Sequence, residues 1–74
     1  MTGYRFAIVI EKDKDGYFAY CPELQGCYTQ GNTFEEVTSN IRDAIKLHVE
    51  DRLANNEVIP TSEIVSLSSI EVTA

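Results

Sequence analysis

The chain has few basic residues and no long apolar run, and each shortage argues against a class of function. Six lysines and arginines are scattered among 74 residues and are outnumbered by twelve acidic residues, which gives a formal charge of −6. Since affinity for phosphates comes mainly from clustered lysine and arginine, we expect no direct binding to nucleic acid. No apolar run approaches the roughly 20 residues that span a bilayer, and no secretory signal opens the sequence, so we expect a cytoplasmic protein without membrane contact.

The acidic surplus has two interpretations. A basic protein is a natural partner for an acidic domain, because opposite potentials steer and orient docking. Excess negative charge also keeps a small domain soluble without any partner. Solubility is enough to explain the charge on its own, so the choice between these two interpretations depends on the rest of the sequence.

The sequence offers few candidates for catalysis. The single histidine, His48, falls on the apolar stripe of a predicted helix, and a residue at the edge of the core explains it better than a general base does. Cys21 and Cys27 match no C-x-x-C redox or zinc spacing, and in a reducing compartment we predict free thiols packed as small apolar groups. No serine or cysteine has a base and an orienting acid at a recognisable spacing, so we predict that the protein is not an enzyme.

Acidic residues offer two possible cation sites. Asp13 and Asp15 stand before a glycine, as at the start of a calcium loop, but the later ligands are missing and a hairpin turn explains the pattern better. Glu11 could approach Glu35 or Glu36 and hold magnesium for a residual nuclease activity. Helix capping and solvation account for Glu35 and Glu36 without a metal, so we predict no metal and no cofactor.

The periodicity of apolar residues predicts an α+β domain of the order β-β-β-α-β, with an antiparallel three-stranded meander, one covering helix and a returning strand. Pro22 ends the second strand because it has no amide hydrogen for the ladder. Thr33 and Glu36 have the spacing of a capping box at the start of the helix. The predicted elements are strands over residues 4–11, 17–21 and 27–30, a helix from Thr33 to about Asn55, and a strand over residues 64–72.

One helix covers only one face of such a sheet. The other face, with Val9, Phe18 and Tyr20, needs a partner or stays partly wet, and the acids around it make stacking on RNA bases a poorer explanation than protein contact. The helix is long for so small a domain, so its last turns around Val49 and Leu53 are expected to meet another subunit in a homo-oligomer. The stripe that packs on the sheet is predicted to contain Phe34, Val37, Ile41, Ala44, Ile45 and His48.

Three short motifs in a fixed order carry a resemblance to a known family. They are Asp-Gly-Tyr-Phe-Ala-Tyr over residues 15–20, Pro-Glu-Leu-Gln-Gly-Cys over residues 22–27, and Gly-Asn-Thr-Phe-Glu-Glu over residues 31–36. With the helix that follows, the chain resembles the N-terminal domain of HicB-type antitoxins and their stand-alone HicB-like relatives over about residues 4–50. The resemblance implies a fold related in outline to a reduced ribonuclease H fold without its catalytic carboxylates.

The resemblance also implies a function: such domains bind and block a small basic mRNA-cleaving toxin of the HicA type. Full antitoxins of this kind usually add a C-terminal DNA-binding segment, whereas residues 64–74 suffice only for the final strand, so we expect one domain over residues 1–74 that binds no operator. The alternative is a stand-alone homo-oligomeric HicB-like protein with no toxin partner. The residues predicted to contact a basic toxin are Asp13, Asp15, Glu23, Glu35 and Glu36.

Overall fold

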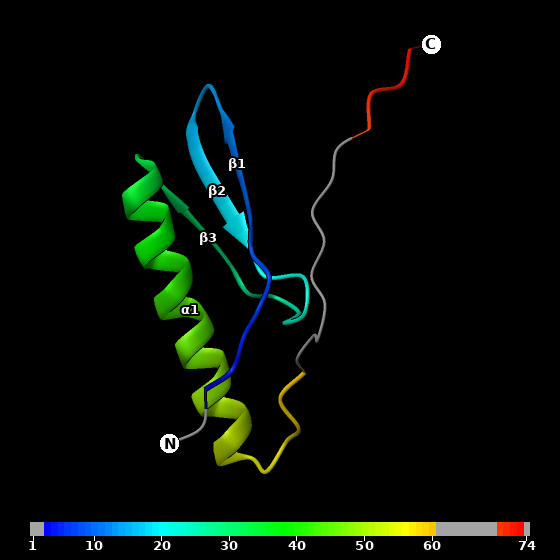
Figure 1. Ribbon diagram of the computed structural model, residues 1–74. Coiled ribbons are helices and arrows are strands. Elements are labelled where there is room, and N and C mark those ends of the chain that lie inside the picture. The colour runs from blue at the N-terminus through cyan, green and yellow to red at the C-terminus, as the bar shows by residue number, and fades with distance from the viewer. Residues whose placement is uncertain (1–2, 61–69, 74) are drawn as a thin grey trace.

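A small sheet with one helix laid across it makes up the domain (Figure 1). The computed structural model describes residues 3–60 and 70–73. The strands pair antiparallel in chain order, and the helix packs chiefly against the last two of them. The predicted α+β class, with its meander and covering helix, is therefore confirmed. The elements are β1 (Val9–Asp13), β2 (Gly16–Tyr20), β3 (Tyr28–Gly31) and α1 (Phe34–Ala54).

The first strand is shorter than its alternating sequence predicts. The alternation begins at Tyr4, but β1 begins at Val9, which is the residue that pairs with Tyr20 at the end of β2. Beyond that pair, Pro22 and the turn after it carry the neighbouring chain away. Residues 3–8 therefore have no strand to pair with and lie beside α1 without regular secondary structure (Figure 1).

The hairpin between β1 and β2 is tighter than the polar run of residues 12–16 suggests. β1 continues to Asp13, which pairs with Gly16, so only Lys14 and Asp15 form the turn. The Oδ1 atom of Asp13 accepts a hydrogen bond of 2.8 Å from the backbone N–H of Asp15. Gly16 has φ +130°, a conformation that other residues rarely adopt, which confirms the part assigned to glycine in this turn.

Both ends of the helix lie where local sequence places them. Thr33 is the N-cap, and its Oγ1 accepts a hydrogen bond of 3.0 Å from the backbone N–H of Glu36. At the other end Asn55 caps the helix and Asn56 adopts φ +57°, in the left-handed region that asparagine tolerates. These are the start and the stop that the sequence predicts.

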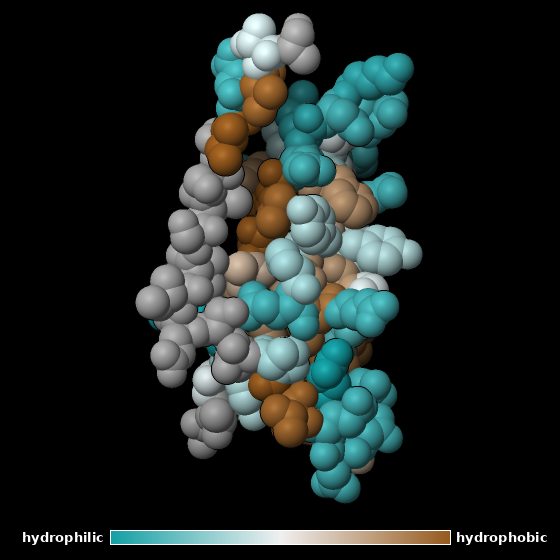
Figure 2. Space-filling view, turned by 90° about the vertical axis from the view of Figure 1, so that its right-hand side faces the viewer, coloured by the Kyte–Doolittle hydropathy of each residue, from teal (hydrophilic) through white to brown (hydrophobic). Residues whose placement is uncertain are grey.

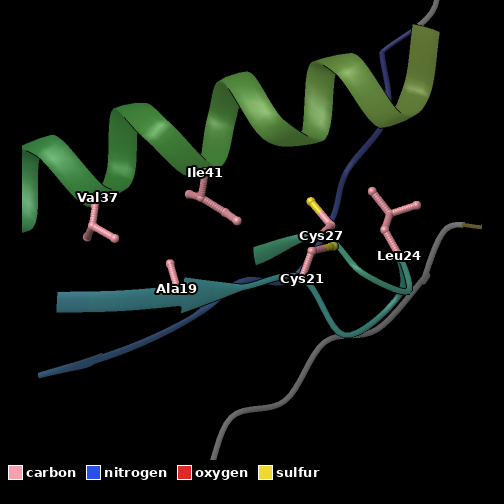
Figure 3. Close-up of a cluster of buried hydrophobic side chains, with 6 residues drawn as sticks. All are labelled: Ala19, Cys21, Leu24, Cys27, Val37 and Ile41. Atoms are coloured by element: carbon pink, nitrogen blue, oxygen red, sulfur yellow. The ribbon is translucent and has the colours of Figure 1, made fainter. Parts of the chain in front are cut away.

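The buried core joins the helix to the sheet and to the turn between β2 and β3 (Figure 3). Val37 and Ile41 point from α1 onto Ala19 of β2, as Figure 3 shows. The rest of the core comes from the turn, where Leu24 is only 1% exposed. Hydrogen bonds from Cys21 N to Cys27 O (3.0 Å) and from Cys27 N to Leu24 O (3.1 Å) close that turn on itself. The turn is therefore part of the core as well as a connection.

Cys21 and Cys27 are free and buried, as predicted. Burial raises the pKa of the Cys21 thiol above its ordinary value of 9.0, and the Glu23 carboxylate adds to this, while backbone hydrogen bonds from Glu23 and Leu24 oppose it. Burial also raises the pKa of Cys27, with a further contribution from Cys21. The folded protein therefore keeps thiol protons that the unfolded chain releases at lower pH.

The raised thiol pKa values predict a fall in stability at alkaline pH. Above about pH 9 the unfolded state binds fewer protons than the folded state, so the free energy of unfolding decreases as pH rises, whereas below that pH the two thiols contribute no slope. Urea unfolding across this pH range measures the effect. A Cys21→Ala/Cys27→Ala variant should lose the part of the slope that the thiols cause, and an unchanged slope would show that other groups account for it.

The C-terminal residues and the membrane-spanning potential of the helix remain to be described. The returning strand predicted over residues 64–72 lies mostly outside the described residues, and residues 70–73 have no regular secondary structure. Within the part of the chain that the structure describes, no helix is both long and apolar enough to cross a membrane.

Candidate functional site

The face of the sheet that points away from α1 is the main candidate for a binding surface. Ala19 of β2 points at the helix, so its neighbours Phe18 and Tyr20 point to the opposite side (Figure 3). Figure 2 views the molecule from the side opposite α1 and shows apolar atoms along the middle with hydrophilic residues beside them. We call this surface the open face, and it comprises Val9, Glu11, Phe18, Tyr20, Tyr28 and Gln30.

Strand register arranges the open face in two rows. Residues directly opposite each other in an antiparallel pair point to the same side, about 4.5–5.5 Å apart at Cβ. Glu11 pairs with Phe18, which pairs with Gln30, so these three form one row across the sheet. This row lines a broad surface hollow together with the residues of the hairpin. The second row is Val9, Tyr20 and Tyr28.

The aromatic rings of the open face contact one another. The centroid of the Phe18 ring lies 5.9 Å from that of Tyr20 and 6.1 Å from that of Tyr28, and the second pair is stacked. Tyr28 is 63% exposed, whereas Phe18 and Tyr20 are half-buried. The expectation that this face stays partly wet without a partner is confirmed for the described residues.

The alternation of β1 separates acidic from basic side chains. Glu11 and Asp13 share the open face with Val9, whereas Lys12 points to the helix side. There the Nζ atom of Lys12 lies 5.9 Å from the centroid of the Tyr17 ring, in a cation–π contact. On β1 the carboxylates therefore point to the open face, although Lys12 also lines the hollow there.

Four of the five predicted contact residues lie at one end of the molecule. Asp13 and Asp15 are in the β1–β2 hairpin, and Glu35 and Glu36 are in the first turn of α1; Figure 1 shows these two elements at the same end. All four are exposed. The sequence predicts all four through turn and cap signals, which do not by themselves show that the turn and the cap are neighbours.

Glu23 lies apart from the other four predicted residues. It belongs to the turn between β2 and β3, at the far end of those strands from the hairpin (Figure 1). Its Oε1 atom accepts a hydrogen bond of 2.8 Å from the backbone N–H of Ala7, and the residue is half-buried. The bond fastens the N-terminal segment to this turn, which gives Glu23 a structural task whether or not it contacts a partner.

The second half of α1 exposes a smaller apolar surface. Leu47 is 66% exposed and Leu53 is 50% exposed, and Val58 just beyond the helix is 85% exposed. Val49 and His48 are half-buried. Figure 1 shows the last turns of α1 extending past the ends of the strands, and the contact of these turns with another subunit stays a prediction.

Metal binding finds no support in the described residues. No group of three or more histidine, cysteine, aspartate or glutamate side chains is close enough to hold an ion there. Glu11 lies on the open face, and the helix start with Glu35 and Glu36 packs beside the other face of the sheet.

Comparisons with known proteins agree with this picture. The family model described as "HicB_like antitoxin of bacterial toxin-antitoxin system" matches residues 6–72. A UPF0150 protein of Synechocystis sp. is 41% identical over 63 residues, covering 84% of this chain and 80% of its own, and a UPF0150 protein of Helicobacter pylori is 41% identical over 64 residues, covering 86% and 89%.

A solved structure is similar as well. A chain of the "HicA3 and HicB3 toxin-antitoxin complex" superposes with a TM-score of 0.63 at 30% sequence identity, over 77% of this chain and 66% of the solved chain. The family match extends over most of the sequence and includes all three strands and the helix. The chain therefore belongs to the HicB-like antitoxin family of bacterial toxin–antitoxin systems.

Proposed function

We propose that this protein is an antitoxin-type binding module that neutralises a small basic mRNA-cleaving toxin of the HicA type by protein–protein contact, without catalysis. The observation that carries the proposal is the pairing of family membership with an acidic-edged sheet face whose Tyr28 is exposed among the described residues. A toxin that binds RNA needs basic residues, and an acidic partner surface complements them. A solved complex of a similar chain with a toxin gives independent support.

Co-purification from native lysate tests the proposal directly. The expected result is a stoichiometric small basic protein, whose expression alone arrests growth and whose effect this protein reverses. Recovery of the bait alone, as a defined oligomer, would overturn the toxin-binding proposal and favour the stand-alone homo-oligomer. The exposed Leu47, Leu53 and Val58 are the specific observation behind that second candidate.

Charge reversal tests the acidic end of the molecule. Asp15→Lys/Glu35→Lys changes one residue in the hairpin and one in the first helical turn, and it leaves Asp13 in place because its carboxylate holds the turn. We expect association with the toxin to slow about tenfold or more at low salt, since complementary potentials act mainly on the association rate. Stopped-flow or surface-plasmon kinetics measure this rate.

The matched control is Asp43→Lys/Glu50→Lys, which makes the same change in net charge on exposed positions of α1. It should slow association much less than the first variant. Equal rates for the two variants would show that net charge, and not the hairpin and helix start, governs docking. Circular dichroism guards against loss of the helix, because a lysine at position 35 opposes the helix dipole.

A further inference from the structure

We propose that the row Glu11–Phe18–Gln30, with Tyr28 beside it, is an arginine-binding site. The inference rests on the proposed function for the identity of its natural partner, a basic protein. It adds the point on the open face at which one arginine side chain of that protein is held. The sequence suggested Glu11 only as a magnesium ligand and did not single out Gln30, because only strand register places the two on either side of Phe18.

The row has the shape and chemistry that a guanidinium group needs. Phe18 lies between Glu11 of β1 and Gln30 of β3 in the register of the sheet, and neighbouring strands are about 4.8 Å apart. A guanidinium is planar, stacks on aromatic rings, and carries five N–H donors in a fixed fork. Stacked over the rings of Phe18 and Tyr28, it can donate to Glu11 on one side and to the Gln30 oxygen on the other.

The residues of the row are held in place by the fold. Phe18 packs against both Tyr20 and Tyr28, which fixes its ring. The backbone carbonyl of Gln30 accepts a hydrogen bond of 3.0 Å from Nδ2 of Asn40, so α1 fastens this part of β3 from the other side. A site built on paired strands costs little ordering on binding, which favours affinity from few contacts.

The charge of the row selects among possible occupants. Stacking of a nucleic acid base would bring a phosphate chain close to Glu11. The hairpin beyond it adds Asp13, Asp15 and Lys12 to the lining of the same hollow, where three carboxylates outnumber one ammonium group. A lysine would satisfy the carboxylate but has no plane to lay on the rings. A second copy of this chain carries the same acidic surplus. An arginine of a basic partner satisfies the ring, the carboxylate and the amide together.

Binding of short peptides tests the site without the toxin. Fluorescein-labelled nona-arginine and nona-lysine carry the same charge, so fluorescence anisotropy at physiological salt separates stacking and bidentate bonding from simple attraction. We expect nona-arginine to bind about five- to tenfold more tightly. Glu11→Gln should remove most of this preference, while Asp43→Asn, an equal charge change on an exposed position of α1, should leave it intact. In NMR titrations the shifts should centre on Phe18, Tyr28 and Gln30.

Each outcome decides the proposal. Equal affinity for the two peptides, or equal effects of Glu11→Gln and Asp43→Asn on the preference, would overturn it. Binding of nona-uridine RNA that Tyr28→Leu abolishes would replace the arginine with a single-stranded nucleic acid. If a co-purified toxin binds Glu11→Gln as tightly as the unchanged protein, the proposed function is kept and the arginine site is wrong. If the protein prefers nona-arginine but captures no toxin, the arginine site is kept and its proposed partner is wrong.

Discussion

Gly31→Ala should be strongly destabilising, although it adds one methyl group at the end of a strand. A Cβ atom at this position would lie 2.7 Å from the backbone N and 2.9 Å from the Cα of Val37, closer than non-bonded atoms approach. Both atoms belong to the helix backbone, so no side-chain rotation relieves the contact and α1 must move off β3. Overpacking of this kind costs about 3 kcal/mol. A chain of 74 residues has only about 4–11 kcal/mol of stability in total.

Urea unfolding followed by circular dichroism measures the effect, and two other glycines supply the controls. Gly3 has nothing within 4 Å of an added Cβ, so Gly3→Ala should be neutral. Gly26 has open space but φ +80°, so Gly26→Ala should show the cost of backbone strain alone, about 1 kcal/mol. If Gly31→Ala unfolds at the same urea concentration as Gly3→Ala, the close approach of α1 to β3 is wrong.

Gly31 also shows where the sequence is and is not informative. The sequence predicts that the third strand ends at Gln30 and that Gly31 belongs to the turn after it, whereas Gly31 is the last residue of β3. Its backbone is not in the left-handed region; the requirement is for space under the helix. That requirement depends on how α1 crosses β3, which is a tertiary arrangement with no local signature in the sequence.

The helix, β2 and β3 are predicted to within a residue, whereas β1 is not. The helix lies between its caps, Thr33 and Asn55, and caps involve neighbours in the chain. The alternation from Tyr4 is a sound strand pattern, but a strand also needs a partner, and the partner chain turns away after Tyr20. The length of β1 is thus decided by β2, which no periodicity in residues 4–11 reveals.

The candidate site, too, is predicted by the sequence only in part. The sequence predicts an uncovered face with Phe18 and Tyr20, because one helix covers one side of a sheet. It does not place Glu11 and Gln30 beside Phe18. The register of a two-residue hairpin places Glu11 there once Asp13 is known to pair with Gly16, and the pairing of β2 with β3 places Gln30. A one-residue error in the hairpin would move Glu11 to the other face. Turn length is therefore the sequence signal that a better prediction of this site requires.

Leu24→Ala should be the most damaging change in the segment that the sequence presents as a plain turn. Leu24 is among the largest fully buried side chains of the described residues, and it packs with Cys21 and Cys27 beneath the helix. Truncating a buried leucine to alanine removes its transfer free energy and leaves a cavity, for a cost of about 3 kcal/mol. In so small a domain this loss should lower the urea midpoint steeply and raise the unfolded population at ordinary temperatures.

Leu47→Ala is the matched control, since Leu47 is 66% exposed on α1 and its truncation should change stability by no more than about 0.5 kcal/mol. Thiol labelling gives a second, local readout. In the unchanged protein the two buried thiols should react only as the chain opens, because exposure and the thiolate form govern reactivity. Leu24→Ala should speed labelling far more than Leu47→Ala does. A Leu24→Ala protein with the stability and thiol protection of Leu47→Ala would mean that this turn merely connects β2 to β3, and that the core ends at Ala19, Val37 and Ile41.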